Sequence, residues 1–354
     1  MPRRDSTESS IPEIAKLLDI RKQGGSGIVL VLGARAGAFY RLSSTFQEMI
    51  MGFSERSLQG LSRSAAFDEC YRVLNEHSFS ERDLDSIFQA ALRDVTVTDA
   101  DLCLADLVKE EYFSEIITTN IDDLLEQAFN QAGVREGQHY EVFIPGRSYE
   151  QRLQHPERRL CRVIKVFGDL VARVYDARRQ RSYLDRQTRL KEHLQQVLES
   201  DILVIGLDPV WDAELIDLIP LDGGQSSTWF VDEDAPPAES RLARVFNARQ
   251  ALYLTGWDGH YDNFLKALFW HLKSSMPTNI RNFFDILSEL RKINSEYKIS
   301  QRERRETQEM LQTTLMQLSS LQQQTEQCFQ LVTSELSMLR EQLGSLQRLL
   351  LRED

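Results

Sequence analysis

Short runs of apolar and β-branched residues recur along most of the chain, and they lead into glycine, aspartate or asparagine. Continuous apolar runs of this length, separated by helical stretches, are typical of a parallel sheet that is covered by helices on both faces. We therefore predict an α/β fold built on a doubly wound parallel sheet. The predicted strands are residues 28–32, 115–119, 162–167, 202–205, 228–231 and 251–255.

Helical patterns rich in Leu, Gln and Glu connect the predicted strands, for example at residues 124–132 and 193–199. Residues 50–110 are also helix-rich, with acidic stretches and no convincing strand. We interpret them as a helical insertion between the first two strands, with a role that the sequence leaves open. In doubly wound sheets, ligands bind beyond the carboxyl ends of the strands. The residues just after each strand are therefore the candidates for chemistry.

The last part of the chain has a different period. A turn at Pro277 precedes a long segment without proline, and from Leu311 apolar residues recur at alternating spacings of four and three. This heptad repeat predicts a coiled coil, and its broad seam favours a trimeric or tetrameric homo-oligomer through residues 311–350. The alternative is a helix that packs on its own domain. The seam positions are Leu311, Leu315, Leu318, Gln322, Thr325, Phe329, Val332, Leu336, Leu339, Leu343, Leu346 and Leu350.

Composition and charge narrow the classes of partner. The 354 residues are 42% hydrophobic, enough for a full-sized core, and carry 54 acidic against 42 basic residues, a net charge of −12. This excess argues against broad binding to nucleic acid or to an anionic membrane. The N-terminus has no apolar signal core, and the chain contains no uninterrupted run of about 18 apolar residues, the length needed to span a bilayer. The cysteines form no C-x-x-C pair. We therefore expect a cytoplasmic protein with no metal site.

The strand ends carry a series of motifs. The second strand ends in Thr-Thr-Asn-Ile-Asp-Asp-Leu at residues 118–124, after a glycine turn, Gly-Ala-Arg-Ala-Gly, at residues 33–37. Lys-Val-Phe-Gly-Asp follows at 165–169 and Gly-Leu-Asp at 206–208. In this order and spacing, residues 25–272 resemble the sirtuin family, and most closely the sirtuin-like domains of bacterial anti-phage defence proteins. The resemblance implies a Rossmann-like fold that binds NAD or ADP-ribose.

The glycine turn is the expected phosphate site. Without side chains, glycines let the backbone approach a pyrophosphate at a helix N-terminus, where free N–H groups favour anions. We name Gly33, Ala34, Arg35 and Gly37 as cofactor-binding residues. Arg35 stands where the family has its second glycine, so it either clamps a phosphate, blocks the approach, or lies in solvent.

Polar residues after the later strands complete the predicted site. The resemblance implies that Asn120 and Asp122 hold the nicotinamide ribose and carboxamide, whereas the simpler alternative is that they cap the following helix. Asp232 could accept hydrogen bonds from the adenosine ribose and repel a 2′-phosphate, which favours NAD over NADP; otherwise it is a solvated turn residue. The predicted cofactor contacts also include Thr119, Phe167, Gly206 and Asp208.

Phe167 departs from the family pattern. The family places a histidine there as the general base, and phenylalanine cannot accept a proton, so we expect impaired catalysis. Asn120, Asp122 and Asp169 are the remaining catalytic candidates. Asp169 or Asp123 could replace the base if its pKa were raised. The histidines to test as substitutes are His155 and His260.

The predicted organisation is a sirtuin-like dinucleotide-binding domain at residues 1–276, a connecting helix at 277–300 and a coiled coil at 301–354. The deacylase members of the family carry a zinc-binding pair of C-x-x-C motifs, which this chain lacks, so the resemblance implies that it is not a zinc-dependent deacetylase. The favoured function is an impaired NAD- or ADP-ribose-binding subunit, with a protein partner in a bacterial defence complex. The alternatives are an active NAD glycohydrolase with a displaced base and a scaffold with a vestigial pocket.

Overall fold

The computed structural model describes residues 10–25, 27–54, 57–58, 60–147, 160–176, 183–222 and 226–273. The predicted boundary at residue 277, the connecting helix and the coiled coil lie outside these residues, as does His155. Within them, no helix is long and apolar enough to cross a membrane.

A seven-stranded sheet in the order β3-β4-β2-β1-β7-β8-β9 forms the centre of the fold, and every neighbouring pair is parallel. The predicted doubly wound sheet is confirmed. The strands that follow β1 first build the sheet on one side of it (β2, β3 and β4) and then on the other (β7, β8 and β9), which makes the carboxyl end of β1 the switch point where such folds bind ligands. The strands are β1 (Ile28–Leu32), β2 (Phe113–Thr118), β3 (Tyr140–Phe143), β4 (Cys161–Lys165), β7 (Ile202–Ile205), β8 (Thr228–Val231) and β9 (Leu252–Leu254).

The strand prediction was wrong in several details, among them the bounds of β2 and β9, which were predicted as 115–119 and 251–255. The edge strand β3 was missed, and β4 ends at Lys165, two residues earlier than predicted. The chain then turns at Gly168, which has a positive φ of 93°, into a small antiparallel hairpin of β5 (Gly168–Asp169) and β6 (Val174–Tyr175). A Cβ at Gly168 would lie 2.0 Å from the carbonyl oxygen of Val174, so the hairpin requires glycine.

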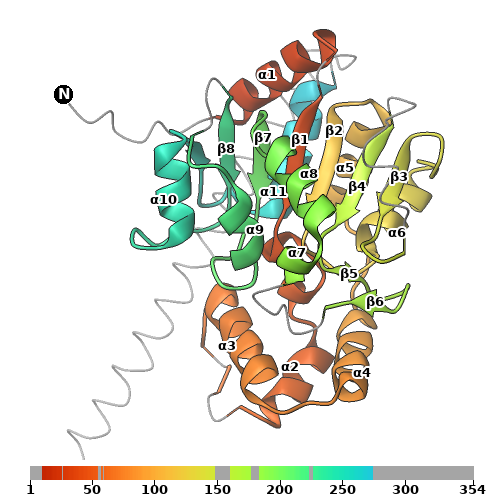
Figure 1. The fold of residues 1–354 in the computed structure, drawn as a ribbon, viewed down its shortest axis with the longest axis vertical. Helices are drawn as coiled ribbons and strands as arrows, with labels where there is room; N and C mark the ends of the chain where they lie inside the picture. Colours follow the sequence, from red (N-terminus) through yellow and green to blue (C-terminus); the bar gives the residue numbers. More distant parts are fainter. Residues whose placement is uncertain are drawn as a thin grey trace, which may run out of the picture. The chain divides into compact units, whose positions relative to one another are not determined.

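Helices cover both faces of the sheet (Figure 1). Alternate residues along each strand point to opposite faces and belong to two separate hydrophobic cores. In β1, for example, Val29 and Val31 face one core while Leu30 and Leu32 face the other. The first core is packed by α8 (Thr188–Val197), α9 (Ala213–Leu218), α10 (Arg241–Ala248) and the short α7 (Tyr183–Arg186). The second is packed by α1 (Ile11–Gln23), α5 (Asp99–Lys109), α6 (Leu124–Gln131) and α11 (Tyr261–Leu272).

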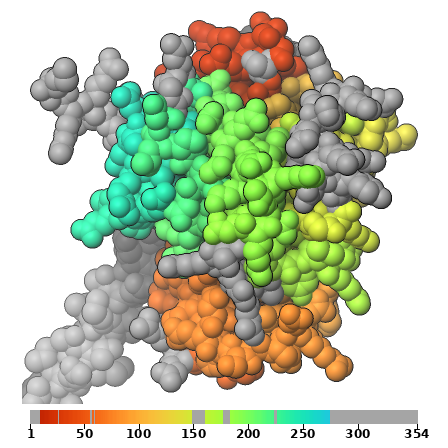
Figure 2. All heavy atoms as spheres, in the orientation of Figure 1, coloured from red at the N-terminus to blue at the C-terminus, as the bar shows by residue number. Residues whose placement is uncertain are grey.

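The predicted insertion is helical, with no strand in its described residues. After the 3-10 turns η1 (Ala34–Ala36) and η2 (Phe39–Arg41), the chain forms α2 (Ser44–Met51), α3 (Arg63–Glu76) and α4 (Glu81–Leu92), whereas α5, which the prediction had included in the insertion, packs on the sheet. These three helices lie together beyond one end of the sheet, and Figures 1 and 2 show them as a continuous orange mass. We call residues 44–92 the helical module.

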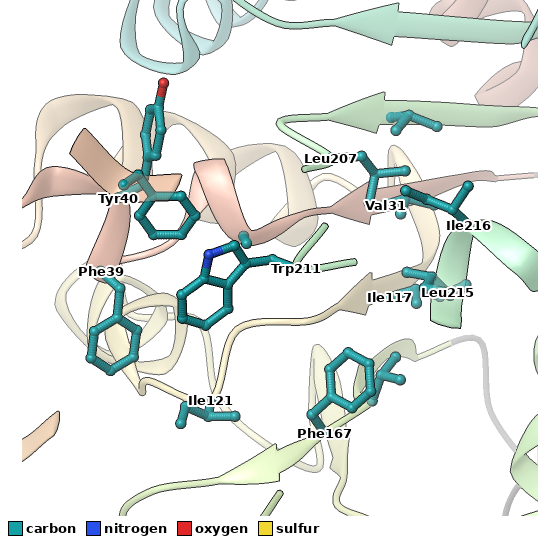
Figure 3. Close-up of a cluster of buried hydrophobic side chains, with 14 of the residues drawn as sticks. Val31, Phe39, Tyr40, Ile117, Ile121, Phe167, Leu207, Trp211, Leu215 and Ile216 are labelled. Carbon is teal, nitrogen blue, oxygen red and sulfur yellow. The ribbon is translucent and has the colours of Figure 1, made fainter. Parts of the chain in front are cut away.

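Aromatic contacts join the helical module to the loops at the carboxyl ends of the strands. Phe67 of α3 stacks on Trp211, which follows β7, with ring centroids 4.8 Å apart. Tyr71 contacts the same indole at 4.5 Å, and Phe88 of α4 meets Tyr175 of β6 at 6.2 Å. Figure 3 shows Trp211 within this buried cluster. The helical module therefore packs over the carboxyl ends of the strands, where the predicted site residues are found.

Candidate functional site

The backbone N–H groups of the loop after β1, residues 33–38, are all hydrogen-bonded within the protein. Each backbone N–H from Gly33 to Ala38 donates a hydrogen bond within the chain, whereas we expected free N–H groups for a phosphate. Two of the acceptors are the buried carboxylates of Asp212 and Asp122. The bonds are Gly33 to the Ile205 carbonyl (2.9 Å), Ala34 to Asp212 (2.9 Å), Arg35 to the Gly206 carbonyl (2.9 Å), Ala36 to the Gly33 carbonyl (3.0 Å), Gly37 to the Ala34 carbonyl (3.2 Å) and Ala38 to Asp122 (3.0 Å).

Glycines at this loop are needed for close approach to neighbouring protein groups. A Cβ at Gly37 would lie 2.0 Å from Oδ1 of Asn120, far inside van der Waals contact. Gly206, at the end of β7, has a positive φ of 67°, and a Cβ there would lie 2.8 Å from the backbone nitrogen of Ala36. Both positions therefore require glycine for the loops to pack together.

Arg35 neither lies in solvent nor is free to clamp a phosphate. Its guanidinium contacts Oδ2 of Asp208 through Nε and Nη2, both at 3.0 Å, and Oδ1 of Asp232 through Nη1 at 3.4 Å. The arginine side chain is 11% exposed, and those of Asp208 and Asp232 are 1% and 3% exposed. Burial lowers the pKa of Arg35, but the two carboxylates more than offset this, so the arginine stays charged. Arg35 thus ties the ends of β7 and β8 to the β1 loop.

Two cavities open beyond the strand ends, on either side of this loop. The first, about 420 Å³ including its open part, is lined by residues after β1, β7 and β8 and by the start of α11. The second, about 360 Å³ with its open part likewise included, is lined by residues after β1 and β2 and by the first turn of α6. Ala36, Gly37 and Tyr261 line both. The two cavities therefore share one wall at the switch point of the sheet.

Asp232 lines the first cavity, and one of its carboxylate oxygens accepts no hydrogen bond from the described residues. Its Oδ1 accepts from Arg35 and from the N–H of Asp234 (3.3 Å), while Oδ2 is buried and has no hydrogen-bond partner among the described residues. Burial raises the pKa of Asp232 to about 6, although Arg35 counteracts the effect. A buried carboxylate oxygen without a partner is unfavourable, so this atom suits a ligand that donates a hydrogen bond.

Asn120 and Asp122 line the second cavity, and both also perform structural work. Nδ2 of Asn120 donates to the Gly33 carbonyl at 2.9 Å. Oδ1 of Asp122 accepts from the N–H of Leu124, the first residue of α6, at 3.1 Å, although the N-cap residue of this helix is Asp123, which makes no side-chain cap hydrogen bond. Burial raises the pKa of Asp122.

A buried ammonium group, that of Lys165, is part of the lining of this second cavity. Nζ of Lys165 donates to the Asp122 carbonyl (2.6 Å), to Oε1 of Glu126 (2.9 Å) and to Oδ2 of Asp169. Burial lowers the pKa of Lys165, but the carboxylates of Glu126 and Asp169 raise it by more than burial lowers it. The pKa therefore lies above its ordinary value, and the amine is protonated. Asp169 also accepts from the N–H of Ala172, so both of its oxygens are engaged. This arrangement makes Asp169 a poor general base.

Phe167 lies in the core, although we had expected it to contact the cofactor. The side chain is 1% exposed and its ring centroid is 5.8 Å from that of Tyr183. It belongs to the same buried cluster as Trp211 and Leu215, drawn in Figure 3, and lines neither cavity. The early end of β4 explains the difference, because Phe167 no longer follows the strand's direction.

The two cavities bring together part of the predicted site. Those of the predicted residues that line a cavity are Arg35, Gly37, Asn120, Asp122, Gly206 and Asp232. Those that line neither are Gly33, Ala34, Thr119, Phe167, Asp169 and Asp208. His260 lines the first cavity, beside Glu233 at 3.2 Å, and so lies on the opposite side of the loop from Asn120.

Sequence reasoning missed several cavity residues. Glu126 follows Asp122 by four residues, one helical turn, which could have been noticed. Arg63 comes from the helical module, and no motif around it in the sequence indicates a binding residue. The missed residues are Leu32, Ala36, Tyr40, Arg41, Arg63, Asp101, Thr118, Leu124, Leu125, Glu126, Lys165, Ile205, Val231, Glu233, Gly259, Tyr261 and Asp262. No group of three or more His, Cys, Asp or Glu side chains among the described residues could hold a metal ion.

The fold and the strand-end cavities define a doubly wound α/β protein with a candidate ligand site at its switch point. Residues 114–251 match the family model of the SIR2-like domain. Over these residues the chain is similar to the SIR2-like domain, which agrees with the resemblance to sirtuins noted from the sequence.

Solved structures give a distant likeness. A structure from work on the mechanism and regulation of Sir2 enzymes is 15% identical, with 74% of this chain and 97% of that chain covered and a TM-score of 0.36. A complex of Sir2 with a p53 peptide and NAD+ is 14% identical, with 73% and 96% covered and a TM-score of 0.30. No curated protein matches the chain.

Proposed function

We propose that the chain binds NAD or ADP-ribose across the two cavities and hydrolyses NAD slowly or not at all. The observation that carries the proposal is the pair of cavities with a shared wall at Gly37, set at the switch point of a SIR2-like sheet. A dinucleotide has two nucleoside halves joined by a diphosphate. Two cavities on either side of one loop match that division.

The adenosine half is assigned to the first cavity. Oδ2 of Asp232, which lacks a partner among the described residues, would accept from a ribose hydroxyl. The same carboxylate would repel a 2′-phosphate. The nicotinamide half falls in the second cavity, beside Asn120 and Asp122.

Weak catalysis follows from the groups available near the second cavity. Phe167 cannot accept a proton and lies in the core, and Asp169 is bound by Lys165. Loss of a general base typically lowers the rate by about 10² to 10⁴. Binding itself needs no proton transfer, so ligand affinity and turnover are separable.

Calorimetry with NAD, ADP-ribose and NADP tests the binding proposal, together with an assay for nicotinamide release. We expect NAD and ADP-ribose to bind more tightly than NADP, and Asp232→Asn to reduce that preference. Equal or tighter binding of NADP to the unmodified protein would contradict the assignment of Asp232. Robust nicotinamide release that is lost in Asn120→Ala would instead establish an active glycohydrolase.

A scaffold with a vestigial pocket is the second candidate, and the β1 loop favours it. All six of the loop's N–H groups from Gly33 to Ala38 already have acceptors within the protein. If neither NAD nor ADP-ribose binds, the scaffold function replaces the first proposal. In either case, we propose that residues 311–350 join copies of the chain, and that the oligomer serves a bacterial defence complex with a protein partner.

A further inference from the structure

The diphosphate of a bound nucleotide would pass a loop whose backbone N–H groups already donate within the protein. In the proposed pose it passes the shared wall at Ala36 and Gly37. The N–H groups there are used, and two neighbouring ones donate to Asp122 and Asp212. Anion binding at this point therefore depends on cationic side chains.

Three arginines line the first cavity within the described part of the chain, and two are firmly committed. Arg35 bridges Asp208 and Asp232. Arg41 contacts both oxygens of Asp101 at 2.9 and 2.8 Å and donates to the Thr96 carbonyl at 2.7 Å. Moving either guanidinium to a ligand would leave buried carboxylates unpaired, which is costly.

Arg63 is held far more loosely. Its side chain is 47% exposed, and Nη1 lies 3.7 Å from Oε1 of Glu233 and 3.2 Å from Nε2 of His260. The guanidinium also lies over the ring of Tyr40, 5.9 Å from its centroid. An ion pair that is this long and exposed contributes little to stability. Arg63 can therefore exchange its partners for a phosphate without a large loss.

We propose that Arg63, from the first turn of α3 in the helical module, is the phosphate-binding residue of this site. This inference rests on the proposed nucleotide binding and extends it to the inserted helices. A guanidinium binds phosphate oxygens through paired N–H donors. The module would then supply a charged ligand contact as well as packing over the strand ends.

The test compares ADP-ribose, which carries the diphosphate, with adenosine, which lacks it. Calorimetry on the full chain should show that Arg63→Gln weakens ADP-ribose binding about tenfold, the effect of losing one hydrogen bond to a charged group. Adenosine affinity should stay within about twofold, as for a surface substitution outside the contact. Arg63→Lys keeps the charge and should recover part of the loss.

Arg82→Gln is the matched control, because Arg82 is exposed on α4 of the same module and lines neither cavity. It should change neither affinity. Glu233→Gln removes the carboxylate that competes for Arg63, so it should strengthen ADP-ribose binding relative to adenosine. Thermal unfolding of each variant checks that the fold is intact.

The outcomes separate this inference from the proposed function. If the unmodified chain binds both ligands but Arg63→Gln weakens neither, or weakens both equally, Arg63 is not the phosphate contact and nucleotide binding still stands. If the unmodified chain binds neither ligand, both proposals fail together. A selective loss for ADP-ribose supports the inference.

Discussion

Replacing Arg35 with methionine would remove the charge that pairs with two buried carboxylates. The side chains of Asp208 and Asp232 are 1% and 3% exposed, so neither can regain water without local opening. Removing one partner of a buried ion pair typically destabilises a protein by about 3 to 5 kcal/mol, because the remaining charge stays buried. We expect Arg35→Met to lower the free energy of unfolding by an amount in this range at about pH 7.5.

The loss should depend on pH through Asp232. Burial raises the pKa of this carboxyl to about 6, so the folded protein holds the proton more tightly than the unfolded chain. The contribution of this group to stability is therefore complete below about pH 4 and is lost as the pH rises through about 6. Since Arg35 counteracts the rise, Arg35→Met should raise the pKa of Asp232 further and widen the pH range of the loss.

Urea unfolding followed by circular dichroism at about pH 5 and pH 7.5 measures both effects. The variant should lose less stability at the lower pH, where Asp232 carries a proton. The double variant Arg35→Met with Asp232→Asn should recover part of the loss at the higher pH, because one unpaired charge is gone. A variant as stable as the unmodified protein at pH 7.5, or a loss of equal size at both pH values, would refute the reasoning.

Three further predictions concern the loop, the tail and the core. Gly37→Ala places a Cβ 2.0 Å from Oδ1 of Asn120 and should destabilise by about 1 to 3 kcal/mol in thermal unfolding, whereas in the control Gly52→Ala the nearest atom is 3.5 Å away and little should change. Truncation after residue 300 should lower the mass measured by light scattering, and an unchanged mass would count against the coiled coil. Phe167→His should destabilise by about 1 to 3 kcal/mol, because it buries a polar ring, and should give no gain in nicotinamide release. A clear gain would show that position 167 reaches the ligand.

The sheet could be predicted because strands buried on both faces are apolar at nearly every position. β1 and β7 were found with their bounds unchanged, and every residue in both is buried. β3 was missed because it lies at the sheet edge, and its residues Glu141 and Val142 are half-buried, so the run of apolar residues is interrupted. The hairpin after β4 consists of two-residue strands, too short for any period to be visible.

The partners of the site residues were beyond sequence reasoning, because they come from distant parts of the chain. Arg35 meets Asp208 and Asp232, which are separated from it by 173 and 197 positions. The alternatives for Arg35 were a phosphate, a blocked approach or solvent, and a pair of buried carboxylates was not among them. Arg63 reaches His260 across 197 positions, and no spacing rule within the helical module points to that contact.

Phe167 shows how sequence and structure give separate reasons to expect weak catalysis, as we propose. From the sequence, the reason is chemical, since a phenyl ring has no group that accepts a proton. From the structure, the reason is positional, since β4 ends at Lys165 and the ring packs in the core against Tyr183. The first reason could be removed by a single substitution, whereas the second could not, because a histidine at 167 would enter the same apolar surroundings. Impaired turnover would therefore be a property of how this segment folds and not only of one missing side chain.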